Sequence, residues 1–350
     1  MPAVNLSLTP RPAAVAAPEE GALVDRFGRV HRDLRISLTD RCSLRCTYCM
    51  PEQGNEWLAR NGILTADEIE RVATIAAAAG ITTFRLTGGE PLLRTDLIDI
   101  VARLARIAGP AGPVEIAMTT NGIRLGEKLP ALIDAGLSRL NISIDTLDRE
   151  RFHALTRRDR LDDVRAGIAA AAASGLRPLK LNAVAMRGVN DDELVDLVEF
   201  ALAHDAQMRF IEQMPLDAGH TWDRNTMVTR EEILAALATR WDIEPVPARG
   251  GAPAERFVLD GGPATVGVIA SVTAPFCGDC DRLRLTADGQ LRNCLFSLDE
   301  YDLLPVLRSG QGDDAVEAIL RSCVHGKLPG HAIDDPSFLQ PARGMNAIGG

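Results

Sequence analysis

Six of the seven cysteines fall into two groups of three, separated by more than two hundred residues. The first triad, Cys42, Cys46 and Cys49, has the spacing C-x3-C-x2-C within a polar, loop-like stretch. Three thiolates on one short loop can bind three irons of a [4Fe–4S] cube, whose usual complement is four cysteines. The fourth iron then stays open to a small molecule. Zinc, which needs a fourth Cys or His nearby, and three buried free thiols are the alternatives.

The second triad, Cys277, Cys280 and Cys294, has the spacing C-x2-C-x13-C. It also lacks a fourth cysteine, so it predicts a second [4Fe–4S] cluster with an open iron. His325 or His331 could instead complete a zinc site, and this alternative stays open.

Two arginines follow the second triad closely. Arg282 and Arg284 alternate along a predicted strand, so they share one face of it. Arginines beside an open iron suit a polyphosphate or another acidic ligand, whereas the alternative is an ordinary solvated strand face. The seventh cysteine, Cys323, fits neither triad and is expected to be a small buried hydrophobe.

A glycine-containing turn follows the second predicted strand. Residues 87–91 read T-G-G-E-P. Two glycines can let a ligand approach the backbone, and Glu90 can stabilise an ammonium group. Such a run by itself is more often a plain turn. Its position shortly after the first triad favours the ligand-binding interpretation.

Composition excludes several classes of protein. A net charge of -10 and a pI near 5.2 argue against a surface that coats nucleic acid. The longest nearly apolar run, 72–81, is too short to span a bilayer. The first two dozen residues carry no signal-peptide pattern and are expected to form a disordered tail. An odd number of cysteines without such a signal indicates a reducing, cytoplasmic setting.

Strand-like and helix-like segments alternate from residue 34 to about 211, which predicts six βα units and a parallel sheet. A complete TIM barrel needs eight such units, so we expect an α/β fold with an incomplete (βα)6 TIM-type barrel. The expected strands cover 34–38, 81–86, 114–118, 138–144, 179–184 and 208–211. The first helix begins at a capping box, Thr65 to Glu68. The other expected helices cover 96–107, 127–135, 161–174 and 191–203.

After Trp241 a linker rich in Pro and Gly precedes a small C-terminal region that carries the second triad. The expected domains are therefore 1–24, a disordered tail; 25–244, the partial barrel; 245–325, the auxiliary-cluster region; and 326–350, a tail ending in Gly-Gly. Within the second region, short strands are expected at 255–259, 264–270, 281–286 and 290–294, followed by a helix at 313–322.

Polar residues at the predicted strand ends are candidates for the site. Parallel-sheet enzymes place their chemistry at the carboxyl ends of strands. Thr119 ends the third strand and Asp145 the fourth, although either residue alone could be structural. Lys180 is more informative, because a lysine inside an apolar strand needs an anion or a solvated cavity.

The first triad, with Tyr48 before its last cysteine, and the G-G-E-P turn resemble the radical S-adenosylmethionine (SAM) enzymes. Together with T-T-N-G, N-I-S-I-D, the second triad and the terminal Gly-Gly, the chain from residue 25 to 350 is similar to the GTP 3′,8-cyclase family of molybdenum cofactor biosynthesis. The resemblance implies that the first triad holds the SAM-binding [4Fe–4S] cluster. It also implies a second cluster on Cys277, Cys280 and Cys294, whose open iron meets the guanine of GTP.

The resemblance assigns further roles motif by motif. SAM contacts are implied for Tyr48, Gly89, Ser143 and Met214. GTP contacts are implied for Arg35, Arg85, Thr119, Lys180, Arg282, Leu283 and Arg284. The last ten residues have no helical or strand period, yet the resemblance implies that they reach into the active site and are needed for cyclisation. Arg343, Gly349 and Gly350 are the tail residues expected to be required.

The implied activity is the radical cyclisation of GTP to (8S)-3′,8-cyclo-7,8-dihydroguanosine 5′-triphosphate, the first step of molybdopterin biosynthesis. An external electron donor would be needed, nucleic acid and membranes are not expected partners, and a homodimer is left open. Two alternatives differ in class. One is another radical SAM enzyme with an auxiliary cluster, and the other is a non-catalytic iron–sulfur protein for electron transfer.

Overall fold

The computed structural model describes residues 21–217, 219–247, 249–335 and 338–349. Residues 1–20 of the expected disordered tail, and Gly350, lie outside the described residues. Leu23 is buried in the core, and its N–H donates to the carbonyl of Ala79 at 3.0 Å. Packed structure therefore begins before residue 25.

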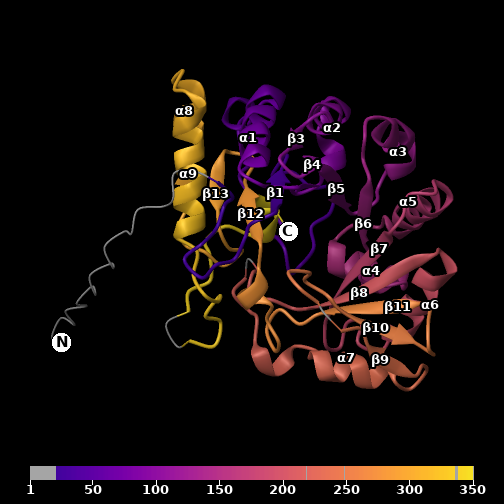
Figure 1. The fold of residues 1–350 in the computed structure, drawn as a ribbon. Helices are drawn as coiled ribbons and strands as arrows, with labels where there is room; N and C mark the ends of the chain where they lie inside the picture. The colour runs from indigo at the N-terminus through magenta and orange to yellow at the C-terminus, as the bar shows by residue number, and fades with distance from the viewer. Residues whose placement is uncertain (1–20, 218, 248, 336–337, 350) are drawn as a thin grey trace.

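Six parallel strands form the centre of the fold, in the order β1-β2-β5-β6-β7-β8 (Figure 1). Each lies within a few residues of its expected position, which confirms the partial barrel. The strands are β1 (Asp33–Ser37), β2 (Thr83–Thr87), β5 (Glu115–Thr120), β6 (Arg139–Ser143), β7 (Leu179–Ala185) and β8 (Ala206–Glu212). A small separate hairpin consists of β3 (Ala108–Gly109) and β4 (Gly112–Pro113).

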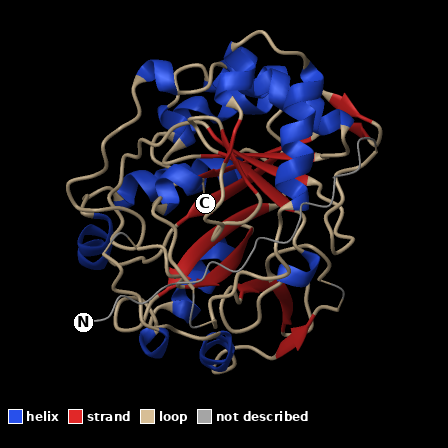
Figure 2. Ribbon diagram, turned by 90° about the vertical axis from the view of Figure 1, so that its left-hand side faces the viewer, coloured by secondary structure: helices blue, strands red, loops and turns tan. Residues whose placement is uncertain are grey.

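Helices cover the outside of these strands (Figure 2). The expected capping box is present at the start of α1, where Thr65 and Glu68 bond reciprocally to each other's backbone. Among the helices that cover these strands, α4 and α7 were not expected, and α7 also begins with a capping box, Thr229 with Glu232. The helices are α1 (Ala66–Ala78), α2 (Leu97–Leu104), α3 (Leu125–Asp134), α4 (Arg149–Thr156), α5 (Leu161–Ala173), α6 (Leu194–Ala203) and α7 (Arg230–Leu237).

The C-terminal region extends both ends of the central sheet. β11 (Thr265–Ile269) pairs in parallel with β8, and β12 (Arg282–Leu285) pairs in parallel with β1. Eight parallel strands therefore curve around the interior, and β11 and β12 are not neighbours in the sheet order. The remaining strands are antiparallel additions at the two edges: β9 (Ile243–Pro245), β10 (Glu255–Leu259), β13 (Gln290–Arg292) and β14 (Tyr301–Asp302).

The C-terminal helices are α8 (Leu304–Arg308), α9 (Asp313–His325) and α10 (Met345–Ile348). The last of them lies near the centre of the molecule, where both views place the end of the chain (Figures 1 and 2). Four 3₁₀ turns, η1 to η4, cover Arg60–Gly62, Pro91–Leu93, Arg224–Thr226 and Cys277–Asp279. No helix of the described residues is long and apolar enough to cross a membrane.

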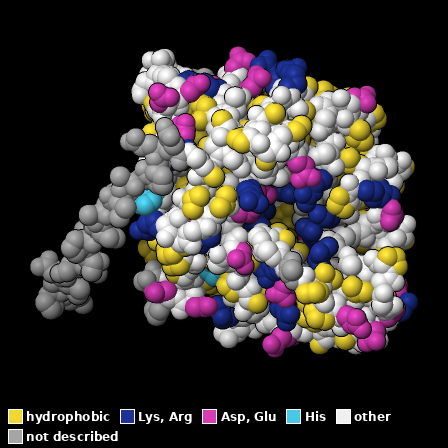
Figure 3. Space-filling view, in the orientation of Figure 1, with side chains coloured by type: hydrophobic (Ala, Val, Ile, Leu, Met, Phe, Trp, Pro, Cys, Tyr) yellow, Lys and Arg dark blue, Asp and Glu magenta, His cyan; other side chains and the backbone are white. Residues whose placement is uncertain are grey.

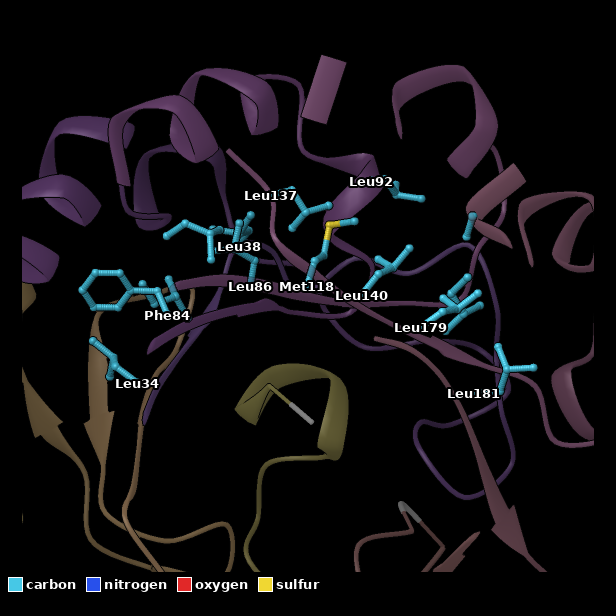
Figure 4. Close-up of a cluster of buried hydrophobic side chains, with 14 of the residues drawn as sticks. Leu34, Leu38, Phe84, Leu86, Leu92, Met118, Leu137, Leu140, Leu179 and Leu181 are labelled. Carbon is cyan, nitrogen blue, oxygen red and sulfur yellow. The ribbon is translucent and has the colours of Figure 1, made fainter. Parts of the chain in front are cut away.

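The main core lies between the strands and the outer helices. Leu34, Phe84, Met118 and Leu140, from four successive parallel strands, are fully buried on this side (Figure 4). Because side chains of a strand alternate between its faces, the residues next to these positions point to the interior of the barrel. That inner face carries the candidate site.

Candidate functional site

The inner face of the barrel encloses a cavity of about 710 Å³. Figure 3 shows Lys and Arg side chains gathered around a hollow on one face of the molecule. In a complete TIM barrel the interior is filled by packed side chains, whereas polar side chains here surround open space. The expected site residues that line the cavity are Arg35, Tyr48, Arg85, Thr119, Ser143, Lys180, Met214, Cys277, Cys280, Arg282, Arg284 and Cys294.

The two cysteine triads lie at opposite ends of the parallel strands. The first follows the carboxyl end of β1. Cys280 of the second lies two residues before β12, whose first residue, Arg282, pairs with the first residue of β1, Asp33. Because β13 runs antiparallel to β12, it returns the chain to Cys294 at this same end. The expectation that the chemistry gathers at the carboxyl ends therefore holds for the first triad alone.

The loop of the first triad packs against the G-G-E-P turn. The N–H of Gly89 donates to the carbonyl of Thr39 at 2.7 Å, and the N–H of Glu90 donates to that of Arg41 at 2.8 Å. A Cβ on Gly89 would lie 2.7 Å from the carbonyl oxygen of Asp40, closer than real Cβ atoms come. This glycine thus lets two backbones meet, a role that was not foreseen from the sequence. Gly89 is not among the residues that line the cavity.

The carboxylate of Glu90 faces the protein rather than the cavity. It accepts hydrogen bonds from the Thr120 hydroxyl at 2.6 Å and from the N–H groups of Asn121 and Leu92 at 2.7 and 3.0 Å. Burial raises the pKa of Glu90 to about 7, although these bonds act in the opposite direction. The side chain is 1% exposed and ties the turn to the end of β5. Its expected role as the partner of a ligand ammonium is not supported by this placement.

Replacing Gly89 with Ala should weaken the first cluster. The added methyl would overpack against backbone atoms, at a cost of about 1–3 kcal/mol, and push the cysteine loop away. We expect iron bound by the first triad and SAM cleavage to fall, together with the unfolding midpoint. Gly62→Ala is the matched control, because a Cβ there meets nothing within 4 Å. Unchanged iron and stability with a raised KM for SAM would instead make Gly89 a direct SAM contact.

The first triad is a suitable donor set for an iron–sulfur cube. Burial raises the pKa of Cys42 to about 11 and that of Cys49 to about 12, and repulsion between neighbouring thiolates adds to the effect at Cys49. Three thiolates there need a strongly positive partner, which irons supply. Among the described residues, no three Cys, His, Asp or Glu side chains converge on the position of a single ion. In a cube each thiolate bonds its own iron, so such convergence is not required.

The second triad has more positive surroundings. Burial would raise the pKa of Cys280, but the nearby Lys327 and Arg282 lower it overall. Both ring nitrogens of His331 are engaged, Nε2 with the Ser271 carbonyl at 2.9 Å and Nδ1 with the Ile333 N–H at 3.2 Å. The alternative in which this histidine completes a zinc site is therefore disfavoured.

The carboxyl-end part of the cavity contains three of the four expected SAM contacts, Tyr48, Ser143 and Met214. Tyr48 lies between two cysteines of the first triad, and its hydroxyl donates to Asp145 Oδ2 at 2.8 Å. The other Asp145 oxygen accepts the N–H of Val184 at 2.8 Å. Burial raises the pKa of Asp145 to about 6 despite these bonds. With Ser143 and Met214 this end offers a phenol, a hydroxyl, a thioether and a buried carboxylate.

The middle of the cavity carries a row of arginines. The register pairs Arg35 with both Arg284 and Arg85, so the three lie side by side on β12, β1 and β2. Arg35 Nε and Arg85 Nη1 are buried with no hydrogen-bond partner among the described residues. Burial lowers the pKa of all three guanidinium groups, and repulsion from neighbouring arginines adds to it. Unsatisfied donors and crowded positive charge favour a polyanionic ligand.

Five arginines of the cavity were missed from the sequence: Arg32, Arg139, Arg209, Arg249 and Arg256. Arg209 pairs in register with Asn182, and burial followed by repulsion from Arg85 lowers its pKa to about 9. The signal that identified Lys180, a cation at an inward position of an apolar strand, also applies to Arg209. Arg139 differs from Arg209 in that its charge is already compensated, because it forms an ion pair with Glu115 at 2.6 Å.

The affinity for a triphosphate should fall as the pH rises above 7. Burial, followed by repulsion from Arg209, Arg139 and Arg85, lowers the pKa of Lys180 to about 7. A bound polyanion favours the charged amine and raises this pKa, so above pH 7 binding must take up a proton. Phosphate monoesters are already mostly ionised there. The affinity for GTP should drop by up to about tenfold per pH unit.

Calorimetric titration of GTP between pH 6 and 9 would measure this dependence. Lys180→Met should bind about 1.5–3 kcal/mol more weakly at pH 6. In this variant the affinity for GTP should also no longer show the fall above pH 7 that Lys180 causes in the wild type. An identical pH dependence in the variant would assign the decline to another group.

Seven of the expected residues do not line the cavity: Cys42, Cys46, Cys49, Gly89, Leu283, Arg343 and Gly349. Leu283 points into the core and is 0% exposed, so only its backbone is available to a ligand. Arg343 forms ion pairs with Asp288 at 2.8 Å and Glu300 at 2.7 Å and does not line the cavity. Gly349 comes closer to the site, because its carbonyl accepts a hydrogen bond from Arg284 Nη1.

The C-terminal tail is packed rather than frayed. Asn346 and Ile348 are buried, and Met345 lines the cavity. The Asn346 amide donates to the carbonyl of Asp40 at 3.0 Å and accepts from Asn55 at 3.1 Å. The tail therefore lies against the loop of the first triad, although the sequence showed no period from which α10 could be predicted.

The partial barrel and the first triad define a radical SAM enzyme, and comparison with known proteins agrees. The radical SAM superfamily profile matches residues 36–201, and a profile described as Molybdenum Cofactor Synthesis C matches residues 206–333. Within that superfamily the chain belongs to the GTP 3′,8-cyclases. The enzyme of that name from Streptomyces coelicolor is 54% identical over 340 residues, which cover 96% of this chain and 99% of the relative. GTP 3′,8-cyclase 2 of Mycobacterium tuberculosis H37Rv is 52% identical over 339 residues, or 95% of this chain and 93% of that protein.

Solved structures agree on the fold. Streptococcus suis SuiB bound to its precursor peptide SuiA superposes with a TM-score of 0.59 at 13% identity, covering 91% of this chain and 76% of SuiB. SuiB bound to S-adenosylmethionine gives a TM-score of 0.57 at 13% identity, covering 92% and 77%. At this identity the likeness concerns architecture alone. As the radical SAM family implies, the chain uses a [4Fe–4S] cluster and SAM.

Proposed function

We propose that this protein cyclises GTP to (8S)-3′,8-cyclo-7,8-dihydroguanosine 5′-triphosphate, the first step of molybdopterin biosynthesis. The observation that carries the proposal is one cavity lined by Tyr48 from the loop of the first triad, by the second triad and by the row of arginines, in which Arg35 and Arg85 each have a buried nitrogen without a partner among the described residues. The names of the relatives support the substrate. A cytoplasmic, reducing location and an external one-electron donor belong to the same proposal.

Two [4Fe–4S] clusters are part of the proposal, one on each triad. Cys42, Cys46 and Cys49 would hold the cluster of the partial barrel at 25–244, and Cys277, Cys280 and Cys294 that of the auxiliary region at 245–325. When bound and reduced by the external donor, a cluster on the first triad would supply the electron for cleavage of SAM to methionine, and the adenosyl group released would take the hydrogen from C3′ of GTP. Joining C3′ to C8 would then need one further electron and a proton to give the dihydro product.

The protein's own task is to position SAM and GTP. At the carboxyl end, Tyr48, Ser143 and Met214 would contact SAM, with the Tyr48 ring fixed by its bond to Asp145. Gly89 would contribute through its backbone and by holding the cysteine loop. An adenosyl group bound there would face the row of arginines in the same cavity.

GTP would lie between the two triads. Arg35, Arg85 and Arg284 would neutralise the triphosphate, helped by Lys180 and Arg209. Arg282 lies at the amino end of β12, beside the second triad, and its guanidinium is 4.5 Å from the centre of the Phe276 ring. We propose that the guanine faces this end, toward the open iron, while Thr119 contacts GTP on β5.

Anaerobically reconstituted protein, SAM, a chemical reductant and each nucleoside triphosphate in turn provide the test. Of the nucleoside triphosphates, only GTP should give a cyclised product, together with one 5′-deoxyadenosine per turnover. Cleavage of SAM without conversion of any nucleotide would favour another radical SAM substrate. Stable clusters that never cleave SAM would favour an electron-transfer protein.

A further inference from the structure

The chain uses lysine at only three positions among its 38 basic residues, Lys128, Lys180 and Lys327. Lys128 lies on α3, and Lys180 lies in the cation cluster of the cavity. Lys327 follows the end of α9 and is not among the proposed substrate contacts. It is 3% exposed, so its charge is buried and needs a compensating partner.

The partners of Lys327 belong to the second triad and its strand. Its Nζ lies 3.4 Å from Cys280 Sγ and 2.8 Å from the carbonyl oxygen of Arg282. No carboxylate of the described residues lies within ion-pair distance of this ammonium. A buried ammonium next to a sulfur is stable where that sulfur is a thiolate.

Neighbouring contacts fix the position of Lys327. A Cβ on the preceding Gly326 would meet the hydroxyl of Tyr301, so the Tyr301 side chain packs closely against the backbone there. On the other side, Arg29 donates to the carbonyls of Cys277 at 2.6 Å and Leu328 at 2.7 Å. The same guanidinium therefore holds the backbone of a cluster ligand and that of the residue after Lys327.

We propose that Lys327 is a positioning residue for the second cluster, whose ammonium bonds to the Cys280 thiolate and raises the reduction potential of that cluster. This inference rests on the proposed function, because it presupposes an iron–sulfur cluster on the second triad. The potential of such a cluster depends on its net charge and on hydrogen bonds to its sulfurs. A buried positive charge stabilises the reduced, more negative form. The same charge would draw electron density from the open iron and so favour its binding of the guanine.

Lys327→Met removes the charge and keeps the length of the side chain, Lys327→Gln keeps a neutral donor, and Lys327→Arg keeps the charge. Lys128→Met is the matched control, because Lys128 also donates to a backbone carbonyl, that of Leu92 at 2.7 Å, but belongs to α3. Each full-length variant is reconstituted anaerobically, analysed for iron and sulfide, and titrated with dithionite under EPR. The chain with Cys42, Cys46 and Cys49 replaced by Ala assigns the signal of the second cluster.

We expect both neutral variants to make reduction of the second cluster at least about tenfold less favourable, a shift of about 59 mV to lower potential. Lys327→Arg should keep most of the wild-type reduction potential of the second cluster, and Lys128→Met should leave that potential unchanged. Loss of the second cluster in the neutral variants, with retention in Lys327→Arg, would also support a charge held against the thiolate. Neutral variants with a full cluster and the wild-type potential would overturn the inference. Absence of iron from the second triad in the wild type would instead refute the proposed function.

Discussion

Replacing Cys277, Cys280 and Cys294 together with Ala should remove about half of the iron, leave SAM cleavage intact and abolish conversion of GTP. The physical reason is that the two triads are separate units at opposite ends of the strands. Two cubes predict about eight irons per chain, and each triple replacement should leave about four. Iron and sulfide analysis, with chromatography of 5′-deoxyadenosine and of the nucleotide product, measures all three outcomes.

The reciprocal replacement of Cys42, Cys46 and Cys49 should leave the second cluster and eliminate cleavage of SAM. Cys323→Ala is the control, because that cysteine is fully buried in the main core and should not affect iron content. Zinc in place of iron at the second triad of anaerobically purified protein would contradict the prediction. So would loss of both clusters from either replacement, since it would mean that the two sites are not independent.

Replacing Gly349 with Val should abolish conversion of GTP while both clusters and the fold survive. Gly349 has a φ of 86°, in the left-handed region that disfavours residues with a side chain. A Cβ there would also lie 2.8 Å from Thr87 Oγ1 and 3.2 Å from Ser37 Cβ. The bulkier residue would therefore displace the carbonyl that Arg284 holds, and with it the arginine beside Arg35. The rate of product formation should become undetectable.

Gly330→Ala is the matched control in the same C-terminal segment, because a Cβ there meets nothing within 4 Å. Iron content should equal that of wild type in both variants, and the unfolding midpoint should be unchanged in Gly330→Ala. Removal of Gly349 and Gly350 should have the same effect as Gly349→Val, and a peptide of the last ten residues should partly restore activity, since the tail acts by occupying its place. A truncated protein that converts GTP at the full rate would show that the tail is dispensable.

The sequence predicted those features that depend on neighbours along the chain. The spacing of Cys42, Cys46 and Cys49 indicated a cluster loop without reference to any other segment. The six strands were located by their alternation and the first helix by its capping box, because both signals are local. Lys180 was identified as a cavity residue because a cation in an apolar strand is informative by itself. The order of these motifs indicated the family.

Tertiary structure decided where these features lie relative to one another. The parallel register of β12 on β1 places the second triad at the amino ends of the strands and aligns Arg284 with Arg35. Such pairing depends on segments about 250 residues apart, and no local pattern encodes it. For the same reason the roles of Gly89, whose neighbours are Asp40 and Arg41, and of Lys327 beside Cys280 emerge only in the folded chain. Residue types and their spacing determine local chemistry, whereas the curvature of the sheet and the order of its strands determine the distances between loops.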